Sequence, residues 1–172
     1  MSNGDFYFAI NATFYHFTER WGPESLIAYW RGIGRDYLAP LGQQLAAGGP
    51  PAVAKHWADY FAAEPGGDVA VSQTDDGKVL IDVKDCPALS WLRTSKDAAT
   101  HAPPHPMYCG HCLHINTALA EGMGWTFELQ GGGGACRQWF RAPGPSTAHL
   151  PAGSRSAQDA TAQDAASAGG EA

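Results

Sequence analysis

The chain contains four cysteines, and each falls at the end of an expected helix or strand. Cys109 and Cys112 form a C-x-x-C pair at a helix start, Cys86 follows a strand pattern, and Cys136 follows four consecutive glycines. Turns at element ends let sulfur atoms converge without strain, and four thiolates suit zinc or an iron–sulfur cluster. We therefore expect one metal centre, zinc or iron–sulfur, with these four cysteines as its ligands.

Two other interpretations of the cysteines stay open. A cysteine in the first turn of a helix faces unpaired N–H groups and the positive end of the helix dipole, which favour the thiolate. Cys109 is therefore a candidate catalytic nucleophile. Asn116 follows on the same helical face, where it could orient a substrate carbonyl or cap a metal-site sulfur. Alternatively, Cys86 and Cys136 are small buried hydrophobic side chains without chemistry.

Histidines and glycines surround these cysteines in the sequence. His111 and His114 could replace a cysteine as a zinc ligand or serve as a base, but with four thiols available we place both outside the ligand set. His105 belongs to a proline-rich loop that could close over the site. The four glycines at 131–134 suit a backbone that approaches a ligand closely, and a flexible hairpin turn is the alternative.

The helices and strands that must position these residues follow a simple order along the chain, with helices in the first part and hairpins in the second. Apolar residues recur every three or four positions over 6–21, 26–45 and 53–61, which predicts three helices, the second kinked at Pro40. Alternating patterns on both sides of a C-x-x-C helix, expected over about 107–121, predict two β-hairpins. The sequence thus predicts an α+β fold, with N-terminal helices packed on a mainly antiparallel sheet built from two hairpins and an intervening C-x-x-C helix.

Composition and charge limit the domain organisation and the possible partners of the chain. The 172 residues are 44% hydrophobic and 16% charged, which predicts one α+β domain over 1–141. Residues 142–172, rich in Ala, Ser, Gly and Pro, predict a disordered tail. The net charge of -6 and the absence of a basic cluster argue against nucleic acid as a partner. With no long apolar run and no leader-like N-terminus, we expect a cytoplasmic protein without a membrane partner.

Three short motifs in the second half of the chain occur in a recognisable order. A strand ends in VKDCPALSWL, a Y-C-x-x-C helix follows, and a glycine-rich turn leads into CRQWF. In this order the segment 82–140 resembles the L-2-amino-thiazoline-4-carboxylic acid hydrolase family and, more distantly, vinyl-4-reductase-type domains. Cys86, Cys109 and Cys136 match the family pattern, whereas Cys112 stands where the family has a polar residue such as Asp. The resemblance implies a compact α+β pocket for a small polar heterocycle or amide.

Together these features predict a small hydrolase-like enzyme with a thiol-rich, metal- or iron–sulfur-binding site. Its substrate would be a small molecule with a C–N or C–S bond to be cleaved, such as a cyclic amidine, an amide or a thiazoline. A zinc ion held by three sulfurs would leave a fourth position for an activated water. The alternative is a non-enzymatic domain that senses a ligand, a metal or the redox state through the same four cysteines.

Overall fold

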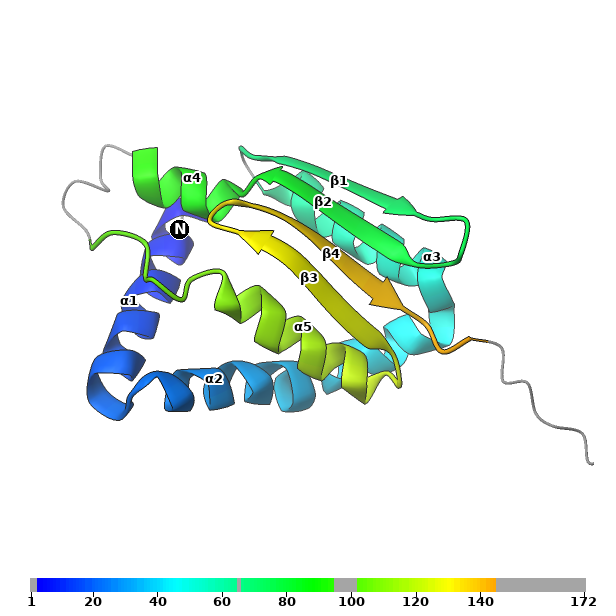
Figure 1. The fold of residues 1–172 in the computed structure, drawn as a ribbon, viewed down its shortest axis with the longest axis horizontal. Helices are drawn as coiled ribbons and strands as arrows, with labels where there is room; N and C mark the ends of the chain where they lie inside the picture. The colour runs from blue at the N-terminus through cyan, green and yellow to red at the C-terminus, as the bar shows by residue number, and fades with distance from the viewer. Residues whose placement is uncertain (1–2, 65, 95–101, 145–172) are drawn as a thin grey trace, which may run out of the picture.

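The computed structural model describes residues 3–64, 66–94 and 102–144, and these residues form an α+β fold, as predicted (Figure 1). The elements, in chain order, are α1 (Asn3–Trp21), α2 (Pro23–Gly32), the π-helical turn η1 (Ile33–Tyr37), α3 (Ala39–Ala63), β1 (Asp68–Gln73), β2 (Val79–Asp85), α4 (Pro87–Thr94), α5 (Gly110–Gly122), β3 (Thr126–Gly132) and β4 (Ala135–Arg141). None of the described helices is both long and apolar enough to cross a lipid bilayer. Of the predicted tail, 145–172 lies outside the described residues.

The strands form one antiparallel sheet in the order β1-β2-β4-β3, so both predicted hairpins are confirmed. Pairing of β2 with β4 joins the two hairpins and sets Val83 opposite Cys136. In Figure 1, α3 lies behind the sheet and packs on β1 and β2, whereas α5 runs beside β3 and contacts α2. The C-x-x-C helix is therefore packed against both the sheet and the N-terminal helices.

The long second helix breaks before Pro40 rather than at it. α2 passes into η1 at Ile33, and α3 starts at Ala39 with Pro40 in its first turn. Proline fits there because the first turn needs no N–H donor. Gly34, inside η1, is buried against α5, and a Cβ at this position would overlap the carbonyl oxygen of Ile115. The break therefore falls where a glycine lets the chain approach α5 closely.

Two apolar clusters make up the core. The first, between α3, α5 and the sheet, includes Leu45, Val53, Val79, Ile81, Leu119 and Phe140. The second, between α1, α2, α4 and the segment before α5, includes Tyr7, Phe14, Leu26, Trp30, Leu89 and Tyr108. Cys86 is partly buried and packs against both clusters. The candidate site lies where these two clusters face each other.

Candidate functional site

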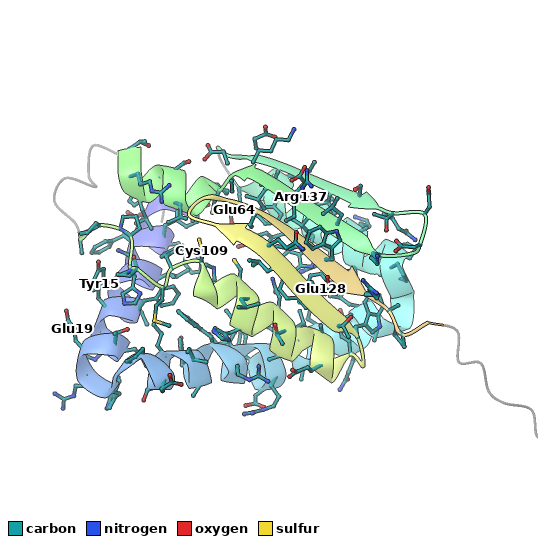
Figure 2. The ribbon with its side chains drawn as sticks, viewed as in Figure 1. Tyr15, Glu19, Glu64, Cys109, Glu128 and Arg137 are labelled. Atoms are coloured by element: carbon teal, nitrogen blue, oxygen red, sulfur yellow. The ribbon has the colours of Figure 1, made fainter. Side chains whose placement is uncertain are left out.

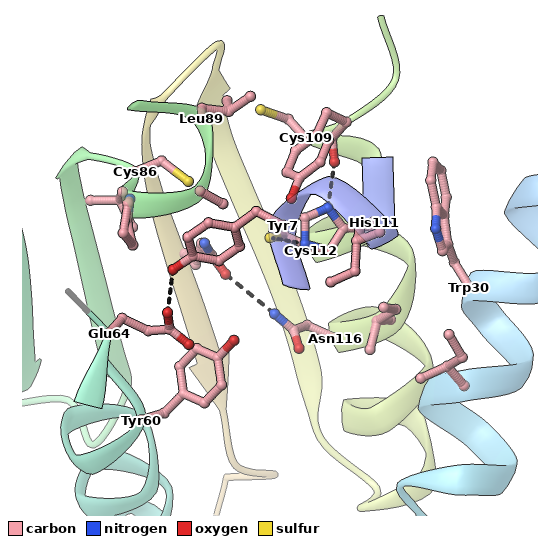
Figure 3. A pocket seen from close by; sticks show the side chains of 18 of the residues that line it. Tyr7, Trp30, Tyr60, Glu64, Cys86, Leu89, Cys109, His111, Cys112 and Asn116 are labelled. Carbon is pink, nitrogen blue, oxygen red and sulfur yellow. Dashed lines mark hydrogen bonds between the residues drawn. The ribbon is translucent and has the colours of Figure 1, made fainter. Parts of the chain in front are cut away.

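A cavity of about 750 Å³ opens between the two apolar clusters. Its wall is mostly apolar and takes side chains from α1, α2, α3, α4, α5 and the second hairpin. Figure 2 shows the side chains on the whole fold, with Glu64 and Cys109 of the cavity wall labelled, and Figure 3 shows part of the wall from close by. Cavities of this size and polarity accommodate small organic molecules.

All four cysteines line this cavity as free thiols. Cys86 joins β2 to α4, Cys109 is the N-terminal cap residue of α5, Cys112 lies in the first turn of α5, and Cys136 belongs to β4. Within the described ranges, no three His, Cys, Asp or Glu side chains are grouped so that they could hold a metal ion. The shared zinc or iron–sulfur centre therefore stays a prediction.

The four-glycine turn is bonded to the cysteine-bearing segments. The Gly133 N–H donates to Cys109 Sγ at 3.2 Å, and the Cys86 N–H donates to the Gly134 carbonyl at 2.8 Å. Arg93 Nη1 donates to the Gly133 carbonyl at 2.9 Å. The turn thus brings its backbone against a thiol, which is the close approach that a run of glycines permits.

Cys112 is the thiol with an imidazole partner. His111 Nδ1 bonds to the Tyr108 carbonyl, and His111 Nε2 lies 3.4 Å from Cys112 Sγ. A carbonyl oxygen can only accept, so Nδ1 carries the proton and the neutral ring presents its Nε2 lone pair to the thiol. Burial raises the pKa of Cys112 to about 11 and lowers the pKa of His111. The resting pair is therefore an uncharged thiol beside an uncharged base.

Asn116 is placed on the cavity wall one turn after Cys112. It is buried, at 5% exposure, and its Nδ2 donates to Gln138 Oε1 at 3.3 Å (Figure 3). Gln138 Nε2 in turn donates to Cys136 Sγ at 3.4 Å. Asn116 therefore serves as the first member of an amide chain that ends on a sulfur.

A carboxylate and two phenols lie together on the opposite wall. The Tyr7 hydroxyl donates to Glu64 Oε2, and Tyr60 lies beside the same carboxylate (Figure 3). Burial, together with the nearby Glu64 charge, raises the pKa of Tyr7 well above its usual range and that of Tyr60 to about 12. Sequence reasoning missed this group. Its signal was an acidic residue at the C-terminal end of a helix, where the dipole disfavours negative charge.

His105 and His114, the other two histidines near the C-x-x-C pair, are held by neighbouring residues of the fold. His105 is 5% exposed, and its backbone N–H donates to the buried Asn11 Oδ1 at 2.8 Å. Residues 95–101 of the proline-rich loop lie outside the described residues, so closure of this loop over the site stays a prediction. The His114 ring stacks on Trp30, with ring centroids 5.9 Å apart. Burial lowers the pKa of both histidines. Of the three histidines near the C-x-x-C pair, His111 is the one that faces a sulfur.

Comparison of the chain with protein-family models, with curated proteins and with solved structures found no match. The resemblance of 82–140 to the thiazoline hydrolase family therefore stays a prediction. The function has to be inferred from the cavity and its polar groups.

Proposed function

We propose that this chain binds a largely apolar small molecule in the cavity and holds one hydrogen-bond-donating end of that molecule at Glu64. One observation carries the proposal, namely a 750 Å³ space with a mostly apolar wall and a carboxylate on one side. Removing apolar ligand surface from water supplies about 25 cal/mol per Å². A carboxylate has about four acceptor positions, so Glu64 can accept from Tyr7, from Tyr60 and from a ligand together.

Binding of N-phenyl-1-naphthylamine tests this proposal. The probe is uncharged and fluorescent, with two aromatic groups and a single N–H. We expect saturable binding by the full chain. Ala88 lines the cavity, so Ala88→Phe should fill part of it and weaken binding about tenfold or more, corresponding to ~1.4 kcal/mol.

Two variants serve as comparisons for Ala88→Phe. Ala28 is exposed on α2 and is not part of the cavity wall, so Ala28→Phe should leave binding unchanged. Glu64→Gln keeps the size of the side chain but removes its charge, and should weaken binding about threefold to tenfold. Equal affinity of the wild type and Ala88→Phe would mean that the probe binds elsewhere and that the proposal is wrong.

A hydrolase-like activity on a small C–N or C–S substrate is the second candidate function. The pair of His111 and Cys112 favours it, because a thiol needs a neighbouring base to act as a nucleophile at neutral pH. A metal ion or iron–sulfur cluster on the four sulfurs is a separate proposal, which metal analysis of the purified protein tests directly.

A further inference from the structure

We propose that Cys112 is a catalytic nucleophile and His111 its general base, and that the pair cleaves an acyl bond of an apolar substrate bound in the cavity. The inference rests on the proposed ligand-binding function, which it deepens by naming the reacting atoms. It also replaces Cys109, the thiol favoured by the helix-start argument. The substrate class is an apolar molecule whose carbonyl carbon carries a nitrogen, sulfur or oxygen leaving group.

The arrangement of carbonyl, imidazole and thiol carries this inference. A nucleophilic thiol needs a base within reach, and that base needs a third group that fixes its tautomer. The Tyr108 carbonyl fixes His111 through Nδ1, so Nε2, which lies 3.4 Å from Cys112 Sγ, is free of its proton. Both side chains line the cavity. The three parts are therefore in the correct order and face the space where a substrate would bind.

The other three thiols have different partners. Cys109 Sγ accepts a bond from the Gly133 N–H, and Cys136 Sγ accepts one from Gln138 Nε2. These partners donate to sulfur and cannot take a proton from it. Cys86 lies at the start of α4, and burial raises the pKa of its thiol. Among the four cysteines, Cys112 is the one bonded to an imidazole nitrogen.

The reaction has two balanced halves. In the first, the Cys112 thiol proton moves to His111 Nε2, Sγ bonds to the substrate carbonyl carbon, and the bond from that carbon to the leaving atom breaks. His111 returns the proton to the leaving atom, which leaves a thioester on Cys112. In the second half, His111 takes a proton from water, the water oxygen bonds to the carbonyl carbon, and the C–S bond breaks. The proton returns to Sγ, and a carboxylic acid is released.

Acylation of the full, reduced chain by 4-nitrophenyl butyrate tests the proposal. The release of 4-nitrophenolate gives the rate, and peptide mass spectrometry after a short reaction locates the butyryl group. We expect the group on Cys112. His111→Asn is the decisive variant, because the Asn amide can still donate to the Tyr108 carbonyl while the Nε2 base is lost. It should slow acylation about 100-fold.

Matched variants at the other thiols complete the experiment. In Cys86→Ser, Cys109→Ser and Cys136→Ser the butyryl group should still be found on Cys112, because none of these changes removes the base. Far-ultraviolet circular dichroism checks the fold of each variant. If His111→Asn does not fold, the position of the butyryl group among the four thiols of the wild type still decides the question.

Several results would overturn the proposal. A butyryl group on another cysteine, a similar distribution over all four, or a His111→Asn rate within twofold of the wild type each contradicts it. If the probe binds but no cysteine is acylated, the cavity binds ligands and the nucleophile is wrong. If Cys112 is acylated through His111 but the probe does not bind, the nucleophile stands and the proposed apolar ligand is wrong.

Discussion

His105 and His111 lie six residues apart, and both rings contact Phe14, yet their hydrogen bonds give them opposite roles. His105 Nδ1 accepts from the Met107 N–H at 3.2 Å, and its Nε2 lies 3.1 Å from the Thr18 hydroxyl. In the neutral ring the proton therefore sits on Nε2. His111 has the reverse tautomer, with the proton on Nδ1 and a lone pair on Nε2 directed at a thiol.

The direction of the pKa shift does not separate these two histidines. Burial lowers the pKa of both side chains. The partners of the ring nitrogens do separate them, because His105 has both nitrogens engaged within a network that ties its segment to α1. His111 has one nitrogen anchored and the other facing a group that can give up a proton. A buried histidine near a cavity is therefore a candidate base only when an acceptor anchors its other nitrogen.

The largest expected effect is a loss of stability when the residue that anchors the His105 segment is replaced. Asn11 is 1% exposed, and its amide donates to the carbonyls of Ala102 and Pro103 while its Oδ1 accepts from the His105 N–H. Asn11→Ala leaves these backbone groups without their partner and should lower the free energy of unfolding by about 3 kcal/mol. Urea denaturation followed by tryptophan fluorescence measures this loss.

The control for Asn11→Ala is on the same helix. His16 is exposed on α1, and His16→Ala should change the free energy of unfolding by less than ~0.5 kcal/mol. The folded fraction of Asn11→Ala should still acylate at Cys112 at the wild-type rate. A stability loss below ~1 kcal/mol, or a loss of acylation in a fully folded variant, would show that the two regions are not separate in function.

The sequence patterns predicted where helices and strands occur better than they predicted which side chains of those elements are buried. Apolar periodicity correctly predicted α1, but Phe6 and Trp21, expected on its apolar stripe, are 55% and 54% exposed. Phe14, from the same stripe, is buried as expected, and the buried face also carries Tyr7 and Asn11. The reason is a polar partner far away in the chain: Asn11 faces inward because the 102–105 segment satisfies its amide. Periodicity of apolar residues contains no information about such a partner.

The site was predicted in part. Cysteine spacing identified four residues that the structure places around one cavity. It favoured Cys109 because helix-start electrostatics can be inferred from sequence, whereas the tautomer of His111 depends on where the Tyr108 carbonyl points. The contact between Tyr7 and Glu64 joins residues 57 positions apart, and no local pattern contains it. The sequence therefore indicated which residue types carry chemistry, and the fold decided which of them meet.

The next effect is the pH dependence of stability that Cys112, the partner of His111, should produce. Burial raises the pKa of Cys112 from 9.0 to about 11, so the folded state binds this proton more tightly than the unfolded state does. The stabilising contribution of Cys112 is then fully present below pH 9 and is lost as the pH rises toward 11. Between pH 8 and pH 10 the wild type should lose about 1 kcal/mol more stability than Cys112→Ser.

Urea denaturation of the reduced wild type and Cys112→Ser at both pH values measures this difference. Cys86 and Cys136 also have raised thiol pKa values, but both proteins contain them, so their contributions cancel. A difference near zero would mean that Cys112 is solvated and that no buried, uncharged pair exists beside His111.

The smallest expected effect concerns Cys136, and it distinguishes four independent thiols from one metal centre. Within the part of the chain that the structure describes, Gln138 Nε2 donates to the Cys136 sulfur, and the serine hydroxyl of Cys136→Ser can accept this bond in the same way. The variant should therefore lose no more than ~1 kcal/mol of stability.

Elemental analysis of protein purified without oxygen is the second measurement. A zinc ion or cluster shared by the four sulfurs would make both quantities fall together in Cys136→Ser and in Cys86→Ser, because the binding free energy of a structural metal is also folding free energy. Loss of a stoichiometric metal together with several kcal/mol of stability would establish the centre expected from cysteine spacing and refute the thiol–imidazole pair as the resting state of Cys112.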